Sequence, residues 1–251
     1  MNKLAVFYII GQFGNPRWKE DFFDDQMNLL KDSGLYDEIQ FIDIFLDASL
    51  NHVPLDIPDK TNNFVYHRSK EESKPHYNKK YNLLNHAQQK IWLFSHANPE
   101  YKILFFGSHG VSHFHDPELS KRKYKWRKYM ETLLISNWKQ SIDLLDYYDC
   151  VGTEYIEDAV FAEGTIRFKA PHYQGHFWWA NARYISRLNP LYSYQAVPWQ
   201  PWLCELWIGS ENPKAYNYYS SGMNQYYEEI DPPFDEIMKT AENHLKELRN
   251  V

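Results

Sequence analysis

Three mainly apolar segments in the first half of the chain, of which the first is unbroken, predict buried strands. They cover residues 4–10, 39–47 and 101–106. A strand with one face in water alternates apolar and polar residues, whereas a strand covered by helices on both sides does not. Residues 18–34 and 81–100 instead carry apolar side chains at helical spacing. The pattern therefore predicts β-α-β units, in which crossover helices join parallel strands.

The second half of the chain has a less regular pattern. The first half predicts an α/β fold with a mainly parallel sheet and helices on both faces, and the second half predicts an irregular C-terminal cover over one edge of that sheet. In such sheets ligands bind beyond the carboxyl ends of the strands, which are the loops after Ile10, Asp47 and Phe106. The remaining predicted elements are a short strand at 64–69, a polar loop at 110–123, one or two helices at 125–149, a short strand at 150–155, a loop or hairpin at 157–171 and a terminal helix at 235–251.

Composition limits the classes of protein that fit. The 251 residues contain no linker, so we expect a single domain over 1–251. The net charge of −6, without a basic tail, disfavours nucleic acid as a partner, because phosphate binding needs a cationic surface. No apolar segment approaches the roughly 20 residues of a transmembrane helix. Two cysteines make no disulfide framework, so we expect a cytoplasmic protein.

Aromatic residues are unusually abundant, at 18% of the chain with 9 Trp. Large rings that line a ligand cleft are one physical reason for such an excess. Two nucleotide-binding fingerprints are missing, since the chain has neither a G-x-G-x-x-G turn nor a G-x-x-x-x-G-K-[ST] loop. The sequence therefore does not indicate a dehydrogenase or a phosphate-loop enzyme.

A histidine-rich segment, GSHGVSHFHDPE, follows the third predicted strand. Its His113, His115 and Asp116 are candidate metal ligands, because imidazole and carboxylate groups bind zinc or manganese. A metal-dependent hydrolase is therefore one interpretation of this segment. The H-x-H-x-D-H spacing of such enzymes is not matched, since Asp116 follows His115 directly. A polar loop with incidental histidines is the alternative interpretation.

The segment HYQGHFWWANARYISRL, residues 172–188, resembles a motif of short glycosyltransferases that is written H-F-S-G-N-F-W-W-A-x-x-x-Y-I-x-x-L. Three further segments resemble that family in the same order along the chain. WRKYMETLLISNWKQSIDLL resembles its W-R-x-x-M helix, YYDCVGTEY its Y-D-x-V-G strand and CELWIGS its E-x-W-I-G segment. Together the resemblance covers roughly residues 101–213.

The resemblance implies a GT-A-like (Rossmann-like) fold and an enzyme of glycan biosynthesis. Such an enzyme moves a sugar from a nucleotide-sugar, with a UDP-sugar the donor by family analogy, to a glycan or glycoconjugate acceptor. The Asp-x-Asp metal motif of many GT-A enzymes is not evident, so a need for Mn²⁺ or Mg²⁺ stays open. A catalytically inactive module of the same fold that binds sugar or nucleotide is the alternative function.

The resemblance also suggests roles for particular residues. Glu205 in CELWIGS is the candidate catalytic base, because an inverting transfer needs a carboxylate near the acceptor hydroxyl. We expect His172 and His176 to contact donor phosphate or sugar, and Gly175 to let a backbone amide approach the ligand. Each of these residues also has an ordinary structural interpretation, as an ion pair, a packed histidine or a turn.

Trp178 and Trp179 are candidate walls of the donor site, together with several cationic and polar residues. Neighbouring residues on a strand face opposite ways, so we expect one tryptophan in a cleft and the other in the core. Arg127 is a candidate partner for the donor diphosphate or for a buried carboxylate. The remaining candidate donor contacts are Gln12 and Arg17 after the first strand and His109, which lies in Gly107-Ser108-His109-Gly110 where the family often has H-T-K-G.

Overall fold

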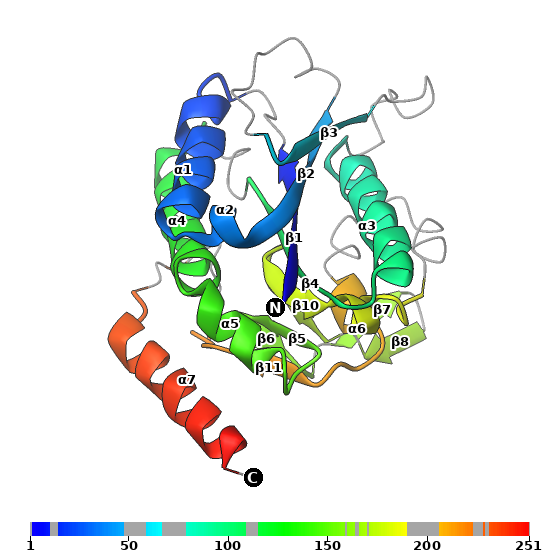
Figure 1. Ribbon diagram of the computed structural model, residues 1–251. Helices are drawn as coiled ribbons and strands as arrows, with labels where there is room; N and C mark the ends of the chain where they lie inside the picture. Colours follow the sequence, from blue (N-terminus) through cyan, green and yellow to red (C-terminus); the bar gives the residue numbers. More distant parts are fainter. Residues whose placement is uncertain are drawn as a thin grey trace.

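The main sheet of the computed structural model has seven strands among the described residues, in the order β11-β5-β10-β4-β1-β2-β3 (Figure 1). The structure describes residues 2–10, 15–47, 59–66, 79–108, 115–158, 160–163, 166–169, 171–189, 206–222, 228 and 231–250. The strands of the main sheet are β1 (Lys3–Ile10), β2 (Ile39–Asp47), β3 (Thr61–Tyr66), β4 (Tyr101–Gly107), β5 (Cys150–Gly152), β10 (Trp178–Asn181) and β11 (Ala215–Asn217).

The sheet is mainly parallel. β1 pairs in parallel with β2 and β4, β2 with β3, and β5 with β11. β10 lies between β4 and β5 and is antiparallel to both. The order β3-β2-β1-β4 is that of the doubly wound Rossmann fold, in which the strand order reverses beside the first strand. The predicted α/β class, GT-A-like (Rossmann-like) and mainly parallel, is confirmed.

Helices cover both faces of this sheet (Figure 1). Val6 and Tyr8 of β1 pack into one core cluster, and Phe7 packs into the other on the opposite face. Both faces are therefore apolar, which explains why these strands are mainly hydrophobic instead of alternating. One face carries η1 (Lys19–Asp24), α1 (Asp25–Asp32), α4 (Pro117–Glu131), η4 (Thr132–Ser136), α5 (Trp138–Leu144) and α7 (Phe234–Arg249), and the other carries α3 (Lys79–Ala97) and α6 (Ala182–Ile185).

The helix predicted over residues 18–34 is divided into two parts. η1 is a π-helical segment, and α1 follows it directly. Gly34 has φ of 74°, so its left-handed conformation ends this helix as the sequence predicts, and the short α2 (Leu35–Glu38) follows. Single-turn π segments are rare and often lie at functional sites. Residues 19–24 are therefore a candidate part of a functional site.

The polar loop predicted over 110–123 is wrong from Pro117 onward, where α4 begins. The side chain of Asp116 accepts a hydrogen bond of 3.0 Å from the backbone N–H of Leu119, and proline occupies the start of the helix. An Asp cap followed by proline is a strong helix start, and it was hidden by the polar residues that follow.

The second half of the chain enlarges the sheet as well as covering its edge. It contributes β5, which lies within the short strand predicted at 150–155, and also β10 and β11, which were not predicted as strands of the sheet. The hairpin predicted within 157–171 is present as β7 (Val160–Glu163) and β8 (Ile166–Lys169). A second small ladder joins β6 (Tyr155–Ile156) to β9 (His172–Tyr173). The predicted terminal helix is α7.

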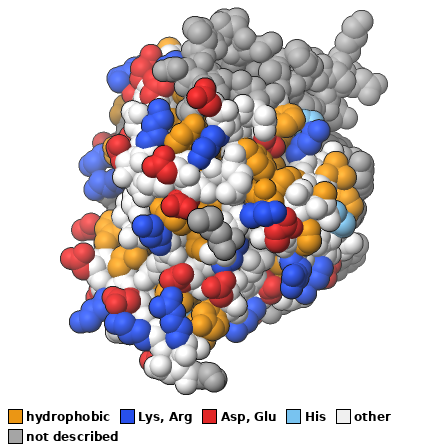
Figure 2. Space-filling view, viewed as in Figure 1, with side chains coloured by type: hydrophobic (Ala, Val, Ile, Leu, Met, Phe, Trp, Pro, Cys, Tyr) orange, Lys and Arg blue, Asp and Glu red, His pale blue; other side chains and the backbone are white. Residues whose placement is uncertain are grey.

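The surface of the molecule is mixed in charge. On the face shown in Figure 2, acidic and basic side chains are interspersed with each other and with small apolar areas. None of the helices built from the described residues has the length and hydrophobicity that a membrane span requires.

Candidate functional site

The ends of the parallel strands define one side of the sheet, which we call the carboxyl edge. β1, β4 and β5 end there at Ile10, Gly107 and Gly152. β10 is antiparallel to β4 and begins at the same edge, with its first residue opposite Phe105. Residues 172–176, which precede β10, therefore lie at the carboxyl edge. Doubly wound folds bind their ligands there, above all where the strand order reverses.

Gly175 and two histidines shape the turn that leads into β10. Gly175 has φ of 80°, a left-handed conformation that a residue with a Cβ rarely adopts. His172 is buried in β9. His176 is half-buried, and its ring meets Phe105 edge-on with 6.2 Å between the ring centroids. The structure brings the three residues together at the carboxyl edge, and contact with a donor stays a proposal for each of them.

Both tryptophans of the pair lie in the core. Trp178 is 2% exposed and belongs to the cluster that includes α3, whereas Trp179 is 0% exposed and belongs to the cluster beneath α4 and η4. The indole N–H of Trp179 donates a 2.7 Å hydrogen bond to the carbonyl oxygen of Leu134. The opposite directions were predicted correctly, but the expectation that one ring lines a cleft is corrected, because helices cover both faces of the sheet.

Arg127 has the buried carboxylate partner that was one of its two predicted roles. It is 0% exposed, and its Nε lies 3.3 Å from a carboxylate oxygen of Glu131, which is 1% exposed. Its Nη2 donates to Asp25 at 3.1 Å, and its guanidinium lies over the ring of Phe22, 4.3 Å from the ring centroid. The guanidinium is thus used inside the protein, where it joins α4 to α1 and η1.

A buried polar chain continues from Glu131 to the carboxyl edge. Gln26 donates to Glu131 at 2.8 Å and accepts a 2.6 Å hydrogen bond from the hydroxyl of Tyr8. The same Gln26 amide lies 3.4 Å from the carbonyl oxygen of Gly107 at the end of β4. Burial raises the pKa of Tyr8 well above its ordinary value, so the phenol stays protonated and remains a donor. Hydrogen bonds therefore couple α1 and α4 to both strands at the reversal point.

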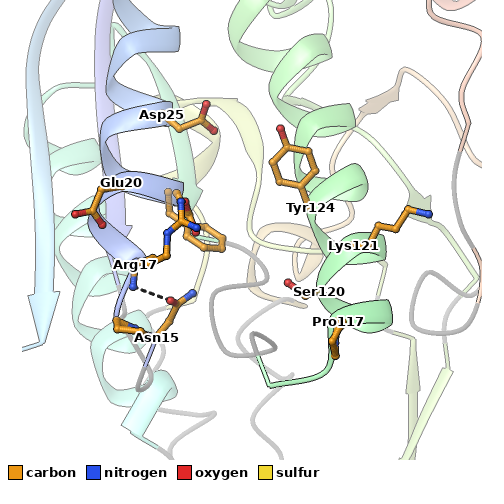
Figure 3. A pocket seen from close by; sticks show the side chains of 11 residues that line it. Asn15, Arg17, Glu20, Asp25, Pro117, Ser120, Lys121 and Tyr124 are labelled. Atoms are coloured by element: carbon orange, nitrogen blue, oxygen red, sulfur yellow. Dashed lines mark hydrogen bonds and ion pairs between the residues drawn. The ribbon is translucent and has the colours of Figure 1, made fainter.

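An open cleft lies between η1 and the first turns of α4 (Figure 3). Its volume is about 760 Å³, which is within the range of small-molecule sites. Arg17 lies on its wall and forms an exposed ion pair of 2.7 Å with Asp21. Arg17, which was predicted to contact the donor, thus lines this cleft. The lining residues are Asn15, Pro16, Arg17, Glu20, Asp21, Phe22, Asp25, Pro117, Ser120, Lys121 and Tyr124.

Glu154, directly beyond β5, was missed by sequence reasoning. Its φ of 55° is unusual for a residue other than glycine, and such strain is concentrated at functional sites. Its buried carboxylate accepts hydrogen bonds of 3.1 Å from the backbone N–H and the hydroxyl of Ser221. Glu154 therefore ties the segment after β11 to the carboxyl edge. Nothing in the residue pattern distinguishes it from an ordinary loop glutamate.

The described part of the histidine-rich segment has a structural role. His115 and Asp116 are exposed, and the carboxylate of Asp116 caps α4. No group of three or more His, Cys, Asp or Glu side chains that could hold a metal ion is found among the described residues. Gln12, His109, His113 and Glu205 lie outside the described residues, so their predicted roles remain predictions.

The segments that carry the family resemblance pack against one another. β5 and β10 are neighbours in the sheet, and the hydroxyl of Tyr184 donates a 2.6 Å hydrogen bond to the carbonyl oxygen of Ile208. A Cβ at Gly209 would collide with the carbonyl oxygen of Pro171, and one at Gly152 would lie 2.6 Å from the ring of Tyr173. The resembling residues therefore form one packed unit, in which residues 172–176 and the end of β5 lie at the carboxyl edge.

The chain was compared with known proteins at three levels. It matches no family model. It also matches no curated protein. Among solved structures it is similar to 4-diphosphocytidyl-2C-methyl-D-erythritol synthase from Anaerococcus prevotii DSM 20548, with a TM-score of 0.41 and 10% identity over 97% of this chain and 99% of the other.

Proposed function

We propose that the protein is a glycosyltransferase of glycan biosynthesis that moves a sugar from a nucleotide-sugar to a glycan or glycoconjugate acceptor. One observation carries the proposal. Segments that resemble one glycosyltransferase family in sequence order pack against one another in a Rossmann-like fold, and one of them begins with residues 172–176 at the carboxyl edge. A chance likeness spread over four segments would not require these segments to pack against one another, or to bring residues 172–176 to the edge where such folds bind ligands.

The proposed donor site lies at the carboxyl edge where β10 meets β4, next to the reversal point between β4 and β1. There the backbone amide at Gly175 and the imidazoles of His172 and His176 would contact the sugar or diphosphate. Oriented donors of this kind stabilise the charge that develops on a leaving diphosphate. The bond from the anomeric carbon to the diphosphate oxygen breaks, and the acceptor oxygen bonds to that carbon. The acceptor proton passes to a carboxylate, for which Glu205 is the candidate.

A thermal-shift screen against nucleotide sugars tests donor binding, with UDP-sugars first and with Mn²⁺ and Mg²⁺ each present or absent. A ligand at 100 times its dissociation constant stabilises a protein by about 2.7 kcal/mol. For a domain of this size that corresponds to a rise in Tm of roughly 5–10 °C. If no nucleotide sugar shifts the Tm, the proposal is wrong.

Donor hydrolysis and transfer then separate the enzyme from an inactive module. We expect Glu205→Gln to keep the donor-induced shift and to abolish transfer. Binding without turnover by the unmodified protein would identify a sugar- or nucleotide-binding module instead. The metal-dependent hydrolase is not favoured, because Asp116, one of its predicted ligands, caps α4.

A further inference from the structure

Tyr124 presents an aromatic ring to the cleft between η1 and α4. Its side chain is on α4 and is 52% exposed, which is high for a large ring in this protein. The guanidinium carbon of Arg127 and the ammonium nitrogen of Lys128 lie 5.3 and 5.7 Å from the ring centroid. Cations at this distance attract an aromatic face, so the ring is held in place although it is exposed.

The cations beside Tyr124 are themselves fixed. The ammonium of Lys128 donates to Asp25 at 2.6 Å and lies 3.0 Å from a carboxylate oxygen of Glu131. Burial lowers the pKa of Lys128, but the two carboxylates outweigh burial and raise the pKa overall, so the ammonium stays charged. Tyr124 thus belongs to an ordered cluster and forms a preorganised surface. Preorganisation reduces the entropy that a ligand loses on binding.

The wall opposite Tyr124 carries groups that can accept hydrogen bonds. Figure 3 shows Asp25 and Tyr124 pointing toward each other across the cleft, whereas Glu20 and Lys121 point away from it. A carboxylate has about four acceptor positions. The bonds that Asp25 makes to described residues use its Oδ2. Its carboxylate can therefore accept hydrogen bonds from a bound molecule.

This combination fits a saccharide better than a phosphate. The Lys121 ammonium points out of the cleft, and Arg17 is already paired with Asp21, so little cationic charge faces the gap. An aromatic face binds the apolar face of a sugar ring, while carboxylates and amides accept from its hydroxyl groups. The cleft volume of about 760 Å³ is ample for a disaccharide.

We propose that the cleft between η1 and α4 binds a saccharide by stacking on Tyr124. If the protein is the glycosyltransferase proposed above, on which this second step rests, the saccharide is part of the acceptor glycan. The buried chain of Arg127, Glu131 and Gln26 connects this cleft with the reversal point at Gly107. The acceptor would thus be held on the same helices that border the donor site.

Saturation-transfer NMR with lactose, maltose and N,N′-diacetylchitobiose tests the site on the full chain. The variants are Tyr124→Ala and Tyr124→Phe, with Leu93→Ala as a matched control because Leu93 is 58% exposed on α3, across the sheet. We expect at least one disaccharide to bind the unmodified protein. Tyr124→Ala should weaken this binding about tenfold, whereas Tyr124→Phe and Leu93→Ala should keep it.

Three results would overturn the saccharide site: no disaccharide binds, Tyr124→Ala binds as well as the unmodified protein, or inorganic pyrophosphate displaces the sugar. The donor thermal shift is read on the same samples and should survive Tyr124→Ala. A Tyr124-dependent saccharide signal without any donor shift would refute the glycosyltransferase and leave the saccharide site standing. A donor shift without saccharide binding would refute the cleft alone.

Discussion

Replacing Trp179 by phenylalanine separates a role in the core from a role in ligand binding. The indole is 0% exposed, and its N–H donates a 2.7 Å hydrogen bond to the carbonyl oxygen of Leu134. The substitution leaves that buried carbonyl without this donor, which costs about 1–3 kcal/mol. The smaller ring leaves a gap that costs about 1–2 kcal/mol more. We therefore expect Trp179→Phe to lower the free energy of unfolding by about 2–5 kcal/mol.

Trp92→Phe is the matched control for this prediction. The indole of Trp92 makes a similar bond, 2.8 Å to the carbonyl oxygen of Leu188, but it is half-buried on α3. Because the Trp92 side chain is partly exposed, solvent can fill the space that the smaller ring leaves, so the expected loss is mainly that of the hydrogen bond, about 1 kcal/mol. Urea denaturation followed by far-UV circular dichroism measures both variants.

The donor-induced thermal shift of Trp179→Phe decides between the two roles. A core residue affects stability and leaves the shift produced by the best nucleotide sugar unchanged. Unaltered stability together with a lost donor shift would refute the placement of Trp179 in the core and restore it as a wall of the donor site.

Three further substitutions test the packed unit and the buried network. Gly209→Ala should lower stability by about 3 kcal/mol, because its Cβ meets a backbone carbonyl oxygen that cannot move aside, and a Tm near that of the unmodified protein would contradict this. Glu131→Ala should cost about 3 kcal/mol or more in urea denaturation, since it removes the buried carboxylate beside Arg127, whereas Glu131→Gln should cost less. Burial raises the pKa of the Cys150 thiol to about 12, so in a Cys204→Ala background a thiol reagent at neutral pH should label the protein only as fast as it unfolds. Rapid labelling of the folded protein would show that Cys150 is accessible.

The parallel half of the sheet was predictable because each of its long strands can be recognised from its own residues. A strand between two helical layers is apolar at nearly every position, and β1, β2 and β4 are apolar over most of their length, with Lys3, Gln40, Asp43, Asp47 and Lys102 as exceptions. The start of α4 could also be recognised from neighbouring residues, Asp116 followed by Pro117. The many polar residues of this segment led instead to the prediction of a loop. The sheet position of β10 was not predictable. A strand of four residues carries too little pattern to show that it inserts between β4 and β5.

The candidate site was less predictable than the fold. Gly175 has the left-handed conformation that glycine adopts most easily, so the turn before β10 is explained, whereas the predicted approach of its backbone amide to a ligand stays a prediction. Tyr124 and Asp25 were missed because each looks like an ordinary helix residue, and their relation depends on how two helices pack. One indication of this site was present in the sequence. Tyr124 is an aromatic residue at a position where the helical period of α4 places side chains on the exposed face.

The placement of the tryptophans changes how the family resemblance should be used. The residues that match best, Trp178, Trp179, Gly152 and Gly209, are buried or fill places where a side chain cannot fit. In the proposed glycosyltransferase, such residues determine how this part of the sheet packs and do not contact the sugar. Selectivity between sugars must then come from side chains that face a cleft, since only these can be left unpaired by the wrong ligand. Substitutions around Tyr124 should therefore change which saccharide binds, whereas substitutions of Trp178, Trp179, Gly152 or Gly209 should change only whether the protein folds.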